Sequence, residues 1–221
     1  MKKSSINNPY IPKLRFKGFD GEWKKHFLNE IFILKNGYTP SKKIINYWTN
    51  GNVPWFTISD IRKNGSILSD SIVKISKKAI KNKLFKTNSI IMATTATVGI
   101  HAIIFNNFLC NQQLTVFEKK ENWINIGDDM FFYYYFYIID EWAIKNIRSS
   151  SFPVIELEYL KTKSIFVPSL HEQNKIARFL SLLDKQISLL ENKLHLYEQV
   201  KLFLNNYLYE KSFKYGSKYF F

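Results

Sequence analysis

Two Glu-x-Lys pairs are the residues that come nearest to a catalytic pattern in this sequence. Glu22 precedes Lys24 in one pair, and Glu118 precedes Lys120 in the other. Such a pair could support metal-dependent phosphodiester cleavage, but the metal would need further carboxylates, and none is placed to complete either pair. A chain with 32 Lys and Arg also contains such pairs by chance. The sequence therefore predicts no nuclease centre.

Other residue types that often perform chemistry are sparse. The single cysteine, Cys110, excludes an intramolecular disulfide and fits a core position in a reducing cytoplasm. No GxxxxGK[ST] phosphate loop and no GxGxxG turn is present. The histidines lack metal-ligand spacing with one another or with the cysteine; they are His26, His101, His171 and His195. We expect a binding protein with no catalytic residue, no metal and no cofactor of its own.

The charge balance favours a polyanionic partner. Lys and Arg outnumber Asp and Glu by 32 to 18, which gives a formal net charge of +14. An AT-rich genome, which enriches lysine, is an open alternative explanation. Residues 71–117 contain no acid, and such a stretch suits either a phosphate-facing surface or a solvated loop. Its lysines are Lys74, Lys77, Lys78, Lys81, Lys83 and Lys86.

The elements that must position any binding residues divide the chain into two parts. Apolar segments separated by Gly, Asn and Ser predict strands at residues 53–58, 71–75, 89–94, 99–105, 113–117 and 163–168. Apolar residues at spacings of three and four predict a helix over residues 128–147. The N-terminus lacks the apolar core of a secretory signal, and the longest apolar run, residues 130–139, is far shorter than the ~20 residues of a membrane span. We expect a cytoplasmic α+β protein with a mixed, β-rich domain.

A long C-terminal helix follows the last of these strands. Ser169 and Glu172 have the spacing of a capping box, which predicts a helix start. Apolar residues then alternate steps of four and three, and no Pro or Gly follows before Gly216, so the helix is expected to reach about Lys211. This heptad seam predicts a coiled coil, since an isolated rod cannot bury it; packing on the chain's own domain stays an alternative. The helix-pairing residues are Ile176, Leu180, Leu183, Ile187, Leu190, Leu194 and Tyr197.

Several segments resemble the specificity subunits of Type I restriction-modification systems. The N-terminal segment PKLRFKGFDGEWKK resembles the opening of that family, and NGYTPSK and NYWTNGNVPWFTISDI resemble the early part of its target recognition domain. IIMATTATVGI and CNQQLTVF are similar to its central strands. VPSLHEQNKIARFLSLLDKQISLLENKL is similar to its junction into a helical spacer.

The resemblance implies a sequence-specific DNA-binding subunit that reads one half of a bipartite target in double-stranded DNA. It implies a target recognition domain at residues 1–165, a helical spacer at 166–211 and a tail at 212–221. Typical members carry two such halves, so this chain looks like a half-length subunit that self-associates. Methyltransferase subunits would dock on it, and through them a restriction subunit; S-adenosylmethionine, ATP and Mg would belong to these partners. A truncated docking or decoy fragment that does not read DNA is the alternative.

Polar residues in the expected loops are the candidate DNA contacts. Donors and acceptors can meet base edges, and cations and hydroxyls can meet phosphates. For each residue a purely structural role, such as capping a turn, stays open. The candidates are Tyr38, Thr39, Ser41, Lys42, Lys43, Ser59, Asp60, Arg62, Lys63, Lys77, Lys78, Lys81, Thr94, Thr95, Thr97, Arg148, Ser149, Ser150 and Ser151.

Overall fold

The computed structural model describes residues 11–148 and 152–215, with side chains up to residue 209. The chain divides into two compact units, Met1–Ala177 and Arg178–Phe221. The first unit holds the strands, and the second continues the C-terminal helix. Strands and helices are mixed along the first unit, which confirms the expected α+β class.

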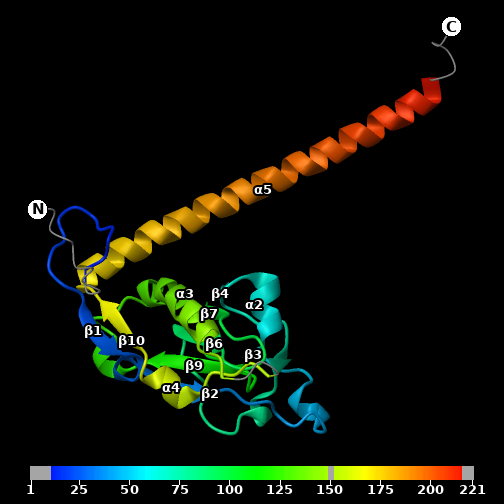
Figure 1. Cartoon of the computed structure of the whole chain (residues 1–221). Coiled ribbons are helices and arrows are strands. Elements are labelled where there is room, and N and C mark those ends of the chain that lie inside the picture. The colour runs from blue at the N-terminus through cyan, green and yellow to red at the C-terminus, as the bar shows by residue number, and fades with distance from the viewer. Residues whose placement is uncertain (1–10, 149–151, 216–221) are drawn as a thin grey trace, which may run out of the picture. The chain divides into compact units, whose positions relative to one another are not determined.

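A five-stranded sheet forms the centre of the first unit (Figure 1). Its order is β2 (Phe32–Asn36), β9 (Leu114–Lys119), β6 (Ser89–Ala93), β7 (His101–Ile104) and β4 (Ile67–Leu68). The neighbours pair antiparallel, except that β4 runs parallel to β7. The strands β6, β7 and β9 coincide with expected strands, because each is a run of β-branched and other apolar residues.

Both faces of this sheet are buried, so its strands alternate between two cores. On β6, Ile90 and Met92 join one apolar cluster, whereas Ile91 and Ala93 join the other. This alternation follows from the two-residue period of a strand. Burial on both faces explains why these segments read as continuous apolar runs.

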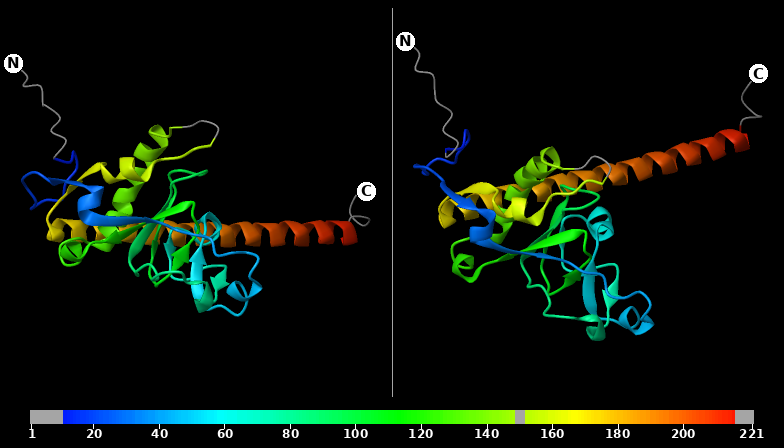
Figure 2. Two further views of the ribbon diagram at one scale, coloured as in Figure 1. Left: turned by 90° about the horizontal axis from the view of Figure 1, so that it is seen from below. Right: turned by 60° about the horizontal axis from the view of Figure 1, so that its bottom comes forward.

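One core lies between the sheet and the helix α3 (Asp129–Lys145), which crosses that face in Figures 1 and 2. The side chain of Asp128 caps α3 by accepting from the backbone N–H of Phe131 at 2.7 Å. Phe136 of α3 contacts Phe117 of the sheet edge-on, with ring centroids 4.8 Å apart. The expected helix over 128–147 is thus confirmed, and its aromatic residues fill the core.

The second core is closed by a three-stranded sheet and a short helix. The strand order is β5 (Lys74–Ile75), β3 (Val53–Phe56) and β8 (Leu109–Cys110), with β3 and β8 parallel. The helix α2 (Ile58–Asn64) follows β3 directly. Residues 57 and 58 therefore leave the strand expected over 53–58, because Thr57 serves as the N-cap of α2. The short 3-10 turns η1 (Ile45–Tyr47), η2 (Lys77–Ala79) and η3 (Glu121–Trp123) lie in the connections.

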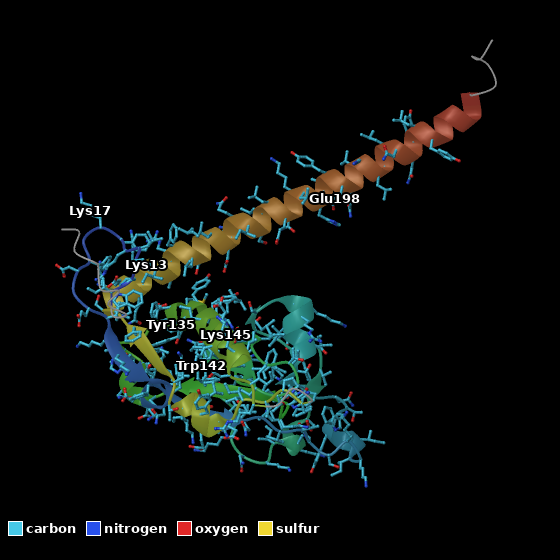
Figure 3. All side chains as sticks on the ribbon, viewed as in Figure 1. Lys13, Lys17, Tyr135, Trp142, Lys145 and Glu198 are labelled. Carbon is cyan, nitrogen blue, oxygen red and sulfur yellow. The ribbon has the colours of Figure 1, made fainter. Side chains whose placement is uncertain are left out.

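A strand pair joins the two ends of the first unit. β1 (Lys24–Phe27) pairs antiparallel with β10 (Ser164–Val167), and the helices α1 (Leu28–Ile31) and α4 (Leu157–Lys161) adjoin this pair in sequence. The hydroxyl of Tyr135 on α3, labelled in Figure 3, accepts from the backbone N–H of Phe166 at 3.1 Å. Burial raises the pKa of this Tyr135 phenol, and the contact fixes α3 against β10.

The C-terminal helix α5 (Leu170–Tyr215) begins where the capping residues predict and has 46 residues. The Ser169 hydroxyl accepts from the Glu172 backbone N–H at 3.4 Å. The Glu172 carboxylate accepts from Arg15 instead of completing the box, so only half of the expected capping box forms among the described residues. No helix in the described part of the chain is long and apolar enough to span a bilayer.

Candidate nucleic-acid interface

Polar side chains gather where β2 and β6 end and β9 begins. The Thr115 hydroxyl lies 2.9 Å from the Thr94 hydroxyl and donates to Asn36 Oδ1 at 3.1 Å. The Thr39 hydroxyl donates to the side-chain oxygen of Gln112. We call the set that shares this edge the polar rim; it consists of Asn36, Thr39, Thr94, Asn111, Gln112, Gln113 and Thr115.

A close backbone approach builds the polar rim. A Cβ on Gly37 would lie 2.2 Å from the carbonyl oxygen of Asn111, so only glycine lets the end of β2 pass this turn. The Asn111 side chain folds back on the turn, since its Oδ1 accepts from Gln113 N at 3.2 Å. Gln112 between them is exposed. The turn thereby presents Gln112 on a rigid support.

Lysines surround the η1 and η2 turns beside the polar rim. Ser76 N donates to Tyr47 O at 2.9 Å, which ties η2 to η1. The Tyr38 hydroxyl donates to Ala79 O at 3.1 Å and accepts from Lys81 N at 3.0 Å. Tyr38 therefore links the rim to this region, which we call the lysine lobe. The lobe consists of the exposed residues Lys42, Lys43, Lys77, Lys78 and Lys81.

No described carboxylate forms an ion pair with a lysine of the lysine lobe. Lys74, in the same acid-free stretch, does have a partner, because its ammonium lies 2.8 Å from Asp70. This hydrogen bond lowers the pKa of the Asp70 carboxyl. The lobe thus offers exposed positive charge at neutral pH, as a phosphate-facing surface would.

The four candidates on α2 differ sharply in exposure. Ser59, Arg62 and Lys63 are exposed, whereas Asp60 is 1% exposed. One Asp60 oxygen accepts from Thr57 N at 2.7 Å, and the other accepts from Ile72 N at 2.6 Å. The carboxylate of Asp60 is therefore occupied by the protein's own backbone. Asn111 N donates to Phe56 O at 3.0 Å, which places the start of α2 next to the rim.

The turn after β6 lies against the segment that follows α3. Ala96 N donates to Pro153 O at 2.8 Å, and Thr95 forms an isolated bridge with Val154. Ala96 has a φ of 63°, a left-handed conformation that costs energy for a residue with a Cβ and that clusters at functional sites. Thr94 is buried, while Thr95 and Thr97 are half-buried.

Arg148 reaches the same region through the backbone. Its N–H donates to Val154 O at 3.3 Å, and its guanidinium pairs with Glu156 at 2.7 Å. The guanidinium also lies 5.8 Å from the centre of the Tyr159 ring. The remaining candidates of this turn, Ser149, Ser150 and Ser151, lie outside the described residues.

The structure therefore brings together candidates that lie far apart in the sequence. Thr39 and Thr94 lie in the polar rim, and Tyr38 links the rim to the lysine lobe. The exposed Ser41 lies beside the lobe, since Trp48 Nε1 donates to its carbonyl at 3.1 Å. Gln112, which was not among the candidates, lies at the centre of this arrangement. The signal for it was the polar triplet directly before an apolar strand, a pattern typical of a tight turn.

Residues that could do other chemistry are buried elsewhere. His101 Nδ1 and Asp140 Oδ2 lie 2.5 Å apart in the core between β7 and α3, and their other polar atoms have no partner among the described residues. Cys110 is 0% exposed, which confirms its core position, and burial raises its thiol pKa above the ordinary range. No group of three or more potential metal ligands occurs in the part of the chain that the structure describes.

The seam residues of α5 fall into two environments. Ile176 is half-buried and packs against the core of the first unit, where Ala177 is 4% exposed. The seam from Leu183 onward lies in the second unit, and its side chains are between 43% and 65% exposed. A second set recurs every seven residues and is equally exposed; it consists of Leu182, Leu189, Leu196 and Phe203.

Sequence comparison identifies the class of protein to which this β-rich unit and long helix belong. Residues 20–199 match the family described as Type I restriction modification DNA specificity domain, and the chain belongs to this family. The family resemblance inferred from the motifs is thereby confirmed. The family is named for specificity and not for a catalytic step.

Curated relatives carry the same description. The chain is 41% identical over 179 residues to the Type I restriction enzyme EcoprrI specificity subunit of Escherichia coli. This alignment covers 77% of this chain and 44% of that protein. It is 30% identical over 176 residues to the Type I restriction enzyme MjaIX specificity subunit of Methanocaldococcus jannaschii. This alignment covers 78% of this chain and 39% of that protein. The chain thus spans less than half the length of these relatives.

Solved structures share the fold. A chain from a study of complex assembly and conformational transition of the type I R-M system aligns with a TM-score of 0.61 at 19% identity, over 83% of this chain and 43% of that chain. The S subunit from M. genitalium aligns with a TM-score of 0.58 at 19% identity, over 80% and 42%. The β-rich domain with a long helix is therefore a fold that known specificity subunits contain.

Proposed function

We propose that this chain reads one half of a bipartite target in double-stranded DNA and brings methyltransferase subunits to it. The observation that carries the proposal is the polar rim with the lysine lobe at its side, on a domain of the DNA specificity family. The rim offers the exposed amides of Asn36 and Gln112 for base edges, and the lobe offers cations for phosphates. The proposal places S-adenosylmethionine, ATP and Mg on partner subunits.

Helix α5 supports the docking half of the proposal. Its exposed seam from Leu183 to Tyr197 can pair with the same seam in a second copy, as the heptad predicts. The stripe of Leu182, Leu189, Leu196 and Phe203 lies about 100° around the helix from Leu183, Leu190 and Tyr197. It offers a second apolar surface for a further helix, which suits a methyltransferase subunit. Exposed apolar side chains that follow one another along a helix mark an interaction surface.

A second candidate function uses α5 alone. The exposed stripes would also suit a docking fragment that binds methyltransferase subunits and does not read DNA. The two functions differ in DNA binding, because a fragment of that kind needs no positively charged recognition surface.

Methylation mapping tests the proposed function. We expect that co-expression of the chain with its methyltransferase subunit modifies adenines in one interrupted sequence motif, as read by modification-sensitive sequencing. Co-expression without the chain provides the control. Methylation that is absent, or independent of the chain, would contradict the proposal.

The salt dependence of DNA binding tests the lysine lobe separately. Replacing Lys77, Lys78 and Lys81 by Ala should weaken binding to all duplexes and lower the slope of log affinity against log salt by about 1 for each phosphate that the variant no longer neutralises. The matched control replaces three exposed lysines outside the interface, Lys24, Lys25 and Lys145. Equal slopes for the two triple variants would show that the lysine lobe does not contact DNA phosphates.

A further inference from the structure

The start of α5 is held to the first unit by a buried ion pair. Arg15 Nε donates to Glu172 Oε1 at 2.7 Å, and Arg15 Nη2 donates to Glu172 Oε2 at 2.7 Å. The two side chains are 15% and 2% exposed. A bidentate pair of this kind fixes both distance and orientation, since two parallel hydrogen bonds resist rotation.

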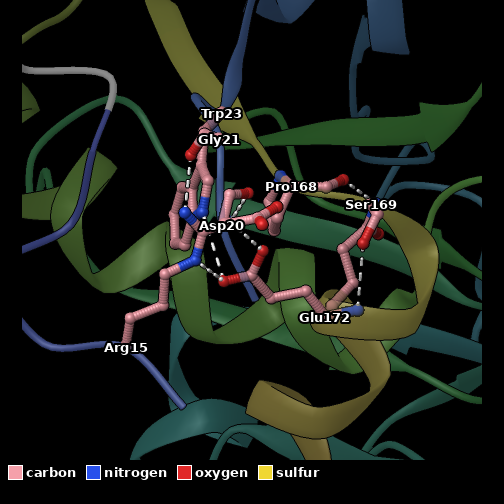
Figure 4. A network of polar contacts seen from close by, with 8 residues as sticks. Arg15, Asp20, Gly21, Trp23, Pro168, Ser169 and Glu172 are labelled. Atoms are coloured by element: carbon pink, nitrogen blue, oxygen red, sulfur yellow. Dashed lines mark hydrogen bonds and ion pairs between the residues drawn. The ribbon is translucent and has the colours of Figure 1, made fainter. Parts of the chain in front are cut away.

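The same guanidinium also holds the N-terminal arm. Its Nη2 donates to Asp20 O at 2.8 Å, and its Nη1 donates to Gly21 O at 2.5 Å, as Figure 4 shows. The indole N–H of Trp23 lies 3.4 Å from Glu172 Oε1. The arm before β1 (residues 15–23) and the first turn of α5 thus meet at one arginine.

A second polar residue fixes the helix from another direction. Gln173 is 1% exposed, and its Nε2 donates to Ile126 O at 3.1 Å and to Pro168 O at 3.0 Å. Its Oε1 accepts from the backbone N–H of Asp128, the N-cap of α3, at 2.8 Å. Glu172 and Gln173 are neighbours on the first turn of α5. This turn is therefore held both to Arg15 of the N-terminal segment and to the residues that precede α3.

This arrangement exceeds what helix initiation requires. A capping residue needs only to satisfy backbone N–H groups at the helix start, whereas Glu172 uses both oxygens to bind Arg15. A buried ion pair adds little net stability, because the loss of hydration offsets the attraction, but it does select one geometry. The pair therefore holds the first turn of α5 in one geometry within the first unit.

We propose that Arg15 and Glu172 are positioning residues that set the spacing between the two half-sites that an assembly of this protein reads. This inference rests on the proposed function. Half-site separation is a geometric consequence of how two DNA-reading units are joined. In this protein the joint is the first turn of α5, and the Arg15–Glu172 pair holds it.

The test measures spacing preference separately from DNA affinity. The full-length protein is bound to duplexes that carry its mapped target with the native spacer, with the spacer changed by one or two base pairs in either direction, or with a single half-site. Wild-type protein should favour the native spacer by about tenfold or more. Arg15→Ala should bind the single half-site within about twofold of wild type but lose most of the spacer preference.

Matched variants separate positioning from folding. Lys17→Ala removes one exposed charge from the same arm and should leave the spacer preference unchanged. Arg15→Lys keeps the charge without the bidentate geometry and should give an intermediate preference. Glu172→Gln provides a second route to the same effect should Arg15→Ala fail to fold.

The outcomes are distinct. An unchanged spacer preference in both Arg15→Ala and Glu172→Gln would overturn the positioning role while leaving the proposed function intact. A parallel loss of half-site affinity in both variants would also overturn it, because the pair would then serve the recognition head itself. A wild-type protein that is indifferent to spacer length would overturn this inference together with split-site reading.

Discussion

At the scale of single residues, burial separates structural polar groups from groups that can meet DNA. Asp60 and Arg62 lie two positions apart on α2, yet Asp60 is 1% exposed and Arg62 is exposed. The carboxylate of Asp60 accepts from Thr57 and Ile72, and its removal would leave those two backbone N–H groups without this acceptor. The two residues therefore make different predictions.

Asp60→Ala should lower the free energy of unfolding by about 1–3 kcal/mol, because two backbone donors lose their partner.

Arg62→Ala should leave thermal stability nearly unchanged and reduce the preference for the target base at one position by about 1–3 kcal/mol. Thermal denaturation and binding to a panel of single-base target variants measure the two effects. Uniform weakening of Arg62→Ala on every duplex would instead identify a phosphate contact.

At the scale of elements, α5 carries a row of exposed apolar side chains from Leu183 onward. Leu183, Ile187 and Leu190 are each more than 40% exposed in the single chain. An exposed helix of this length gains most of its stability from packing an apolar face, so it calls for a partner helix. Replacing a single seam residue should therefore disrupt helix pairing and can be used to test it.

Leu183→Asp should separate paired copies, since it places two carboxylates in an apolar seam. We expect the dissociation constant of self-association to rise by at least about a hundredfold, consistent with the removal of a buried leucine from each copy. Sedimentation velocity measures the change. Lys185→Asp, at an exposed position on the side of the helix away from the seam, is the matched control and should leave the mass of the assembly as it is.

At the scale of the whole molecule, the chain spans 44% of its E. coli relative and 43% of the chain in a solved type I structure. It contains one β-rich unit and one helical unit. Under the proposed function, two copies would supply two recognition units, and identical units related by a two-fold axis would read identical, inverted half-sites.

The prediction at this scale is one of stoichiometry. A duplex with two inverted half-sites should bind two copies of the chain, and a single half-site should bind at least about tenfold more weakly at moderate salt. Native mass spectrometry counts the chains on each duplex. One copy bound to the full target with undiminished affinity would contradict the dimeric arrangement.

Local sequence patterns determined the elements that have strong periodicity. The three central strands, α3 and the start of α5 were all expected, because continuous apolar runs, helical spacing and a capping residue act within a few residues. The short strands β3, β5 and β10 also lie within expected segments, whereas β1, β2, β4 and β8 were not expected. β1 and β2 have little pattern of their own, and they become strands only by pairing with β10 and β9, which follow in sequence by more than 75 residues.

The sequence likewise indicated which residue types the candidate interface contains, but not which particular residues form it. Lysines and hydroxyls in loops indicated which residue types could meet DNA, whereas the fold decided that Asp60 turns inward and that Gln112 lies beside Thr39. The capping pair at Ser169 was read correctly as a helix start, yet the partner of Glu172 proved to be an arginine 157 positions earlier. Local periodicity is a property of neighbouring residues, whereas burial and ion pairing depend on contacts between distant segments, which only the tertiary structure establishes.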